Sequence, residues 1–145
     1  MQGHHIQVPS IILPVQTADY DATATEVMND LLEHISADIE NVDHLQEKTV
    51  FIWATEVVIA GAPGNLNFTL QLSPYASATS TDYFATLGAA PTATIVPTGV
   101  HATVHTATFS WTAHSLVGRV IAQMPVAGAP ATAYWVVQAL FCGKS

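Results

Sequence analysis

The sequence predicts a mainly β protein, an antiparallel β-sandwich of about six or seven strands that follows an extended N-terminal arm and one long amphipathic α-helix. Two observations predict this class. After residue 49, short β-branched and aromatic segments are separated by turn signals. Before it, apolar residues recur at spacings of three and four, as on one face of a helix. The chain therefore divides into an arm at 1–20, a helical segment at 21–48 and a β-sandwich domain at 49–145.

The arm, residues 1–20, is predicted to be extended. Pro9 and Pro14 interrupt its apolar stretch, and proline removes a backbone donor and biases the preceding residue toward extended backbone. The apolar side chains of an extended arm need cover, either on the same domain or on a neighbouring subunit. The candidate contact residues of the arm are Ile11, Ile12, Leu13 and Val15.

The second segment is predicted to form a helix from about Ala24 to Gln46. Thr23 and Glu26 fit a capping box, in which each side chain bonds the backbone N–H of the other residue. Two uses fit the apolar stripe that follows: packing on the domain's own sheet, or association with copies of the same helix. The candidate subunit or capsid contacts of this stripe are Leu31, Ile35, Ile39 and Val42.

The third segment is predicted to be all β. Its clearest strand is 65–73, where apolar residues such as Leu66 and Phe68 alternate with polar residues such as Asn67 and Thr69. Residues 89–99 are rich in Pro and Thr and are expected to be irregular. The other predicted strands are about 49–59, 83–87, 100–111, 115–124 and 132–141.

Charge is scarce and unevenly distributed. The chain has three Lys and Arg residues, eleven Asp and Glu residues and a formal net charge of −8, and only Glu56 and Asp82 of its acids follow Glu47. Three cations cannot neutralise a phosphate track, so no nucleic-acid partner is expected. No apolar run approaches the roughly 20 residues that a bilayer needs, so no membrane partner is expected. The nearly uncharged β domain suggests a surface covered by copies of the chain or by a partner.

No pattern of catalytic residues is present, so the chain is not expected to be an enzyme. The sequence has no nucleophile elbow and no phosphate-binding loop, and Cys142 is its only cysteine. His101 and His105 are four residues apart, which on a strand separates them by about 13 Å, too far for one zinc ion. We therefore expect no metal and no other cofactor.

We make a separate prediction for each of two side-chain pairs in the β domain. Glu56 lies in an otherwise apolar strand and is predicted to form a structural ion pair with Arg119, the only arginine. Tyr75 and Tyr83 flank a polar loop and are candidate exposed aromatic contacts. The tyrosines leave open a different function class, a β-sandwich module that binds a glycan or another small ligand.

Several runs in residues 49–141 resemble the β-sandwich domains of structural proteins in tailed-phage virions. The runs are Asn65–Tyr75, Tyr83–Gly88, Gly118–Gln123 and Tyr134–Ala139. The resemblance implies a non-enzymatic virion protein, most of all a capsid decoration (cement) protein on the capsid surface. Such proteins assemble as homo-oligomers, often trimers, and bind a major capsid protein. A tail or head–tail structural component is the alternative that the same resemblance allows.

Overall fold

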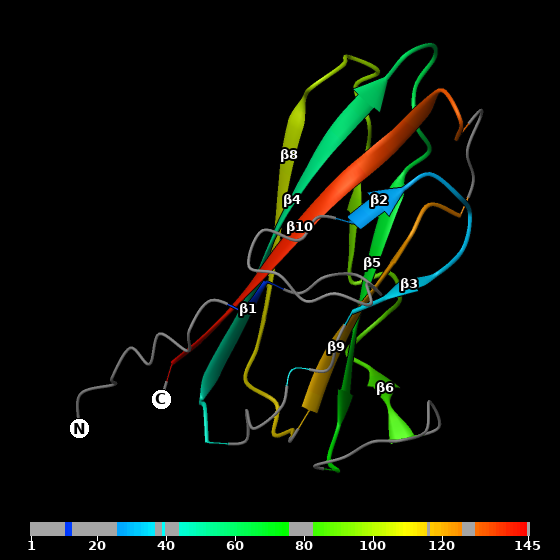
Figure 1. The fold of residues 1–145 in the computed structure, drawn as a ribbon. Helices are drawn as coiled ribbons and strands as arrows, with labels where there is room; N and C mark the ends of the chain where they lie inside the picture. Colours follow the sequence, from blue (N-terminus) through cyan, green and yellow to red (C-terminus); the bar gives the residue numbers. More distant parts are fainter. Residues whose placement is uncertain are drawn as a thin grey trace.

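The computed structural model describes residues 11–12, 26–36, 39, 44–75, 83–115, 117–125 and 130–144. These residues form two five-stranded antiparallel sheets that face each other (Figure 1). The mainly β class and the sandwich-like arrangement of two sheets are therefore confirmed.

The first sheet has the order β1-β10-β4-β8, and β2 also pairs with β10. Its long central strands β4 and β10 run side by side across the molecule (Figure 1). The strands of this sheet are β1 (Ile11–Ile12), β2 (Glu26–Met28), β4 (Glu47–Val58), β8 (Val104–Trp111) and β10 (Ala133–Lys144).

The second sheet has the order β3-β9-β5-β6, and β7 also pairs with β5. β7 lies within residues 89–99, which the sequence predicted to be irregular. That prediction is wrong for Ala93–Ile95, because Thr94 pairs in register with Asn67 of β5. The strands of this sheet are β3 (His34–Ile35), β5 (Leu66–Ser73), β6 (Ala85–Thr86), β7 (Ala93–Ile95) and β9 (Val117–Gln123).

Alternate residues of both sheets point into one shared core. Phe68 of β5 and the Trp135 and Phe141 side chains of β10 are fully buried there. The indole N–H of Trp135 donates to the carbonyl oxygen of Gly64 at 2.8 Å, so its one polar atom is satisfied. Burial of each such side chain stabilises the fold by roughly 1.5–3 kcal/mol.

The predicted long helix is wrong, because the part of 24–46 that the structure describes forms strands and no helix. β2 pairs with β10, β3 pairs with β9, and Ile39 bridges to Gly118. Both sheets offer open edges, and backbone pairing there overrides a local preference for helix that is worth well under 1 kcal/mol per residue. Burial agrees, since Ile39 is fully buried while Leu31 of the same predicted stripe is exposed.

The described part of the predicted arm is β1, which pairs in register with Leu140 and Phe141 of β10. At these two residues the arm lies on its own domain as an edge strand, one of the two arrangements that the sequence left open. Leu13 and Val15 lie outside the described residues. No helix in the part of the chain that the structure describes is long and apolar enough to cross a membrane.

Candidate functional site

The first sheet presents an outward surface that carries no charged side chain from Thr49 of β4 onward, which we call the first outer face. The exposed Glu47, the first residue of β4, lies at the end of this surface and outside it. On β4 the residues Val50, Ile52 and Ala54 point into the core, so their neighbours point outward. The strand register then places outward residues of β8, β10 and β2 beside those of β4. The first outer face consists of Val27, Thr49, Phe51, Trp53, Thr55, Val57, Val104, Thr106, Thr108, Ser110, Tyr134, Val136, Gln138 and Leu140.

Aromatic side chains at the centre of the first outer face remain accessible to water. Phe51 is 36% exposed and Trp53 is 38% exposed, and their rings stack at 6.4 Å between centroids. Hydroxyl groups surround them, and those of Thr49 and Ser110 bond each other at 2.8 Å. Covering a surface of this kind costs little free energy, because no charged side chain has to be desolvated.

β8 is one edge strand of the first sheet among the described strands, with β4 on one side only. The backbone N–H and C=O groups on its other side can pair with a strand of another chain. Soluble proteins usually protect such an edge with Lys or Pro, yet Val104–Trp111 contains no Lys, Arg, Asp, Glu or Pro. The edge of β8 therefore lacks Lys, Arg, Asp and Glu, like the first outer face beside it.

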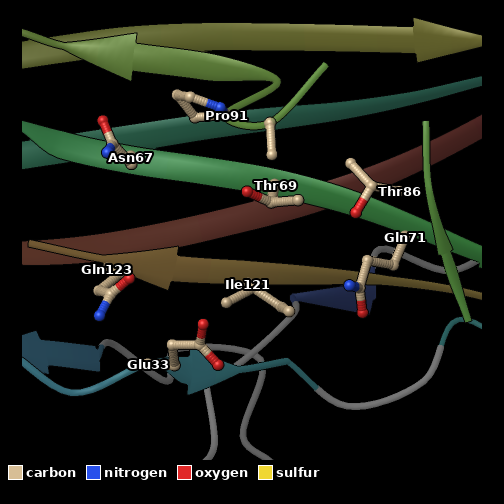
Figure 2. Close-up of a pocket in the computed structure, with 9 residues that line it drawn as sticks. Glu33, Asn67, Thr69, Gln71, Thr86, Pro91, Ile121 and Gln123 are labelled. Carbon is tan, nitrogen blue, oxygen red and sulfur yellow. The ribbon is translucent and has the colours of Figure 1, made fainter. Parts of the chain in front are cut away.

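The opposite side of the molecule differs, because the outer surface of the second sheet is hollowed and polar. β5 and β9 form the floor of a cavity of about 340 Å³ that we call the trough. Figure 2 shows Glu33 beyond β9 on one side, and Pro91 and Thr86 on the β5 side. The trough is lined by Glu33, Asn67, Thr69, Gln71, Thr86, Ala90, Pro91, Ile121 and Gln123.

Each of the three carboxamides in the trough is held by one hydrogen bond. The Asn67 side-chain oxygen accepts from the Thr94 hydroxyl at 2.9 Å, and that of Gln71 accepts from Arg119 Nε at 2.9 Å. The Gln123 side-chain nitrogen donates to the Leu31 carbonyl at 3.1 Å. These bonds fix the direction in which the second polar atom of each carboxamide points.

Glu56 is a buried carboxylate held by four hydrogen-bonding groups from three residues of the same sheet and its adjoining loop. The carboxylate accepts from the N–H and hydroxyl of Thr98, from the N–H of Gly99 and from His105 Nε2, at 2.6–3.0 Å. Gly99 has a φ of 79°, a backbone conformation that favours glycine. Burial by itself would raise the pKa of Glu56, but these hydrogen bonds together lower it to about 2.

The predicted ion pair between Glu56 and Arg119 is wrong, because the structure gives the two residues other partners in different sheets. Arg119 belongs to β9, donates to Gln71 and places its guanidinium 3.8 Å from the centre of the Phe84 ring. The sequence could not show the true partner of Glu56, since His105 lies 49 residues away.

His34 joins two acidic residues of the segment that crosses from the first sheet to the second. Its ring nitrogens lie 2.7 Å from Glu26 Oε1 and 2.8 Å from Asp30 Oδ1. Burial lowers the pKa of His34, but the bonds to Asp30 and Glu26 outweigh it and raise that pKa overall. The bond from His34 lowers the pKa of Asp30. Among the described residues, no group of three or more His, Cys, Asp or Glu could hold a metal ion.

The remaining predicted contact residues fall in different environments. Leu31 is exposed, Ile35 is partly buried and Ile39 is fully buried, so they do not form one contact surface. Val42 lies outside the described residues. Tyr75 and Tyr83 are both about half exposed, and their ring centroids lie 4.9 Å apart, so they form one aromatic pair on the surface.

The trough is not predictable from the sequence, although part of its signal lies in the polar positions of the alternating strand at 65–73. The alternation places Asn67 and Thr69 on one face of that strand but does not show that this face is hollowed. The walls of the trough come from distant segments, and no local pattern reveals them.

No protein-family model matches the chain, and no curated protein matches its sequence.

Proposed function

We propose that this protein is a non-enzymatic structural protein of a virion, a capsid decoration protein that assembles in several copies on a viral shell. The observation that carries the proposal is the first outer face. Its centre combines two accessible aromatic rings, Phe51 and Trp53, with hydroxyl-bearing neighbours and no charge. The cores of protein interfaces have this composition, enriched in aromatic residues and depleted in charged ones.

The open edge of β8 supports the same proposal by a second route. An eight-residue edge without charge or proline can add a strand from a second copy, and the added backbone hydrogen bonds would align the two sheets. Contacts of this kind suit a coat of many copies, because they do not depend on ion pairs that salt weakens. The virion setting itself comes from the resemblance of residues 49–141 to phage structural proteins.

The proposal is tested with shells assembled from the major capsid protein encoded in the same genome. The purified protein is mixed with these shells, sedimented and imaged by electron microscopy, while light scattering gives its oligomeric state in solution. We expect a homo-oligomer that sediments with the shells at a regular array of sites. Trp53→Lys places a charge on the first outer face and should abolish this binding.

Thr69→Lys is the matched control, because it adds the same charge to the outer surface of the other sheet and should leave shell binding intact. Binding to purified tails instead of shells would support the tail or head–tail alternative. A monomer that binds neither particle, or equal effects of the two lysine variants, would overturn the proposal.

A further inference from the structure

We propose that the trough on the second sheet binds a neutral glycan through its hydroxyl groups. This activity is independent of assembly, because the trough and the first outer face lie on opposite outer surfaces of the two sheets. The inference rests on three properties of the trough: its walls, the orientation of its carboxamides, and its charge.

The walls make the trough more than a flat polar sheet surface. Its floor comes from β5 and β9, whereas Glu33 lies just before β3 on one side, and Thr86 of β6 and Pro91, just before β7, lie on the other (Figure 2). Asn67 and Gln71 are four residues apart on β5, so the floor extends about 13 Å along the strand. That length exceeds a single sugar ring and suits an oligosaccharide that lies along β5.

The carboxamides of the trough are oriented before any ligand arrives. Asn67 and Gln71 use their oxygens within the protein, which leaves their NH₂ groups as donors, and Gln123 uses its nitrogen, which leaves its oxygen as an acceptor. Within the described residues these remaining atoms have no protein partner. Their orientation therefore costs a ligand little conformational entropy.

This set of groups matches a ligand whose hydroxyls both donate and accept. The fixed donors and acceptor alternate along the floor with the hydroxyls of Thr69 and Thr86, which can act in either role. Ile121 and Pro91 add small apolar surfaces that fit the C–H face of a sugar ring. Glu33 is the single charged residue in the lining, and the Arg119 guanidinium lies next to the lining, bonded to Gln71. The two charges offset each other, so the trough favours a ligand without net charge.

The experiment uses the full chain and a panel of hexasaccharides of glucose, galactose, mannose and N-acetylglucosamine, with sialylated and sulfated glycans as charged counterparts. Binding is followed by NMR titration of backbone amides, which detects millimolar affinities. We expect at least one neutral hexasaccharide to shift amides of β5 and β9, and the charged glycans to bind more weakly.

Two Thr→Trp variants then test the location. Thr69→Trp fills the trough without removing a side-chain hydrogen bond between described residues and should weaken binding at least tenfold. Thr108→Trp makes the same change on the first outer face and should leave binding unchanged. Gln123→Ala removes the acceptor together with the bond to the Leu31 carbonyl and should weaken binding about tenfold, the equivalent of one to two hydrogen bonds. The melting temperature of each variant confirms that it is folded.

Three results would overturn the inference. The first is a panel in which no neutral glycan shifts the amides of β5 and β9. The second is tighter binding of the charged glycans than of the neutral ones. The third is binding that survives Thr69→Trp and Gln123→Ala but is lost in Tyr83→Ala, because the glycan would then lie on the exposed Tyr75–Tyr83 pair. None of these results affects the proposal on assembly, which is measured by oligomeric state and shell binding.

Discussion

The outer surfaces of the two sheets obey the same alternation of inward and outward residues but differ in chemistry. On β4 of the first sheet, Lys48 and Glu56 are buried on the inner side, while Phe51 and Trp53 face outward and the exposed Glu47 lies at the end of the strand. On the second sheet apolar residues such as Phe68 fill the core, and carboxamides face outward into the trough. A monomer in water would favour two surfaces like the second. The difference agrees with the proposed assembly, in which the first surface is covered and the second stays in water.

The largest expected effect comes from placing charge on the first outer face. The double variant Phe51→Lys with Trp53→Lys should weaken self-association roughly a thousandfold, since a central aromatic contact is typically worth 2 kcal/mol or more. Analytical ultracentrifugation over a concentration series measures the dissociation constant.

The double variant Thr69→Lys with Ile121→Lys adds two charges to the trough and provides the comparison. It should change the dissociation constant of self-association by less than about threefold, because surface substitutions outside an interface have small effects. Similar losses in both double variants would mean that assembly does not distinguish the two surfaces.

The next largest effect concerns the buried carboxylate beneath the first outer face. Glu56→Gln should lower the free energy of unfolding by about 2–3 kcal/mol, since the neutral amide cannot accept from Thr98, Gly99 and His105 together. Glu33→Gln changes an exposed carboxylate at the trough and should cost under about 0.5 kcal/mol. Urea unfolding at neutral pH measures both values.

The same carboxylate predicts acid sensitivity with a defined direction. The pKa of Glu56 is about 2 in the folded protein against an ordinary value of 4.5, so its ionised form stabilises the fold above about pH 4.5. That contribution is lost as the pH falls from about 4.5 toward 2. Stability of Glu56→Gln should therefore decline less over this range than that of the unaltered protein, and parallel declines would contradict the assignment.

The β-sandwich class could be predicted from the sequence because its signals are local. The alternation of Leu66, Phe68 and Leu70 against polar residues depends only on neighbours along the chain. The helix prediction failed for the same reason. The capping pattern at Thr23 and Glu26 and the apolar spacing are local, whereas the pairing of β2 with β10 joins segments about a hundred residues apart.

The candidate sites differ in the same way: features set by neighbouring residues could be predicted, and features set by distant segments could not. The exposure of Tyr75 and Tyr83 followed from their place beside a polar loop, and the structure places both at the surface. The partner of Glu56 depends on the register that sets His105 opposite Ala54, and sequence spacing does not contain that register. The trough likewise needs Glu33 and Pro91 to meet on either side of β5 and β9.

A smaller effect is expected at His34, which holds the crossing segment that carries Glu33 to the trough. Its pKa is raised in the folded protein, so its charged form stabilises the fold below pH about 6.5, and this contribution is lost as the pH rises through the raised pKa. We expect about 1 kcal/mol, because Asp30 is partly exposed to water.

Hydrogen exchange of the Ser36 amide, which bonds the Val120 carbonyl, measures this effect next to the crossing segment. Its protection, corrected for the intrinsic pH dependence of exchange, should fall about fivefold as the pH rises from 6 to above the His34 pKa. His34→Gln should remove this change, and His114→Gln, at an exposed histidine, should retain it. A pH response that persists in His34→Gln would assign the effect to another group.

The smallest expected effect is that of salt on self-association, and it separates an uncharged contact from an ionic one. Raising the ionic strength from about 0.1 M to about 1 M shortens the Debye length from about 10 Å to about 3 Å and weakens surface ion pairs. The first outer face contains no charged side chain, so salt has no attraction to screen there. Screening of the net charge of −8 would only reduce repulsion between copies. The dissociation constant should therefore stay the same or fall by less than about threefold, and a tenfold rise would require ion pairs that the first outer face cannot supply.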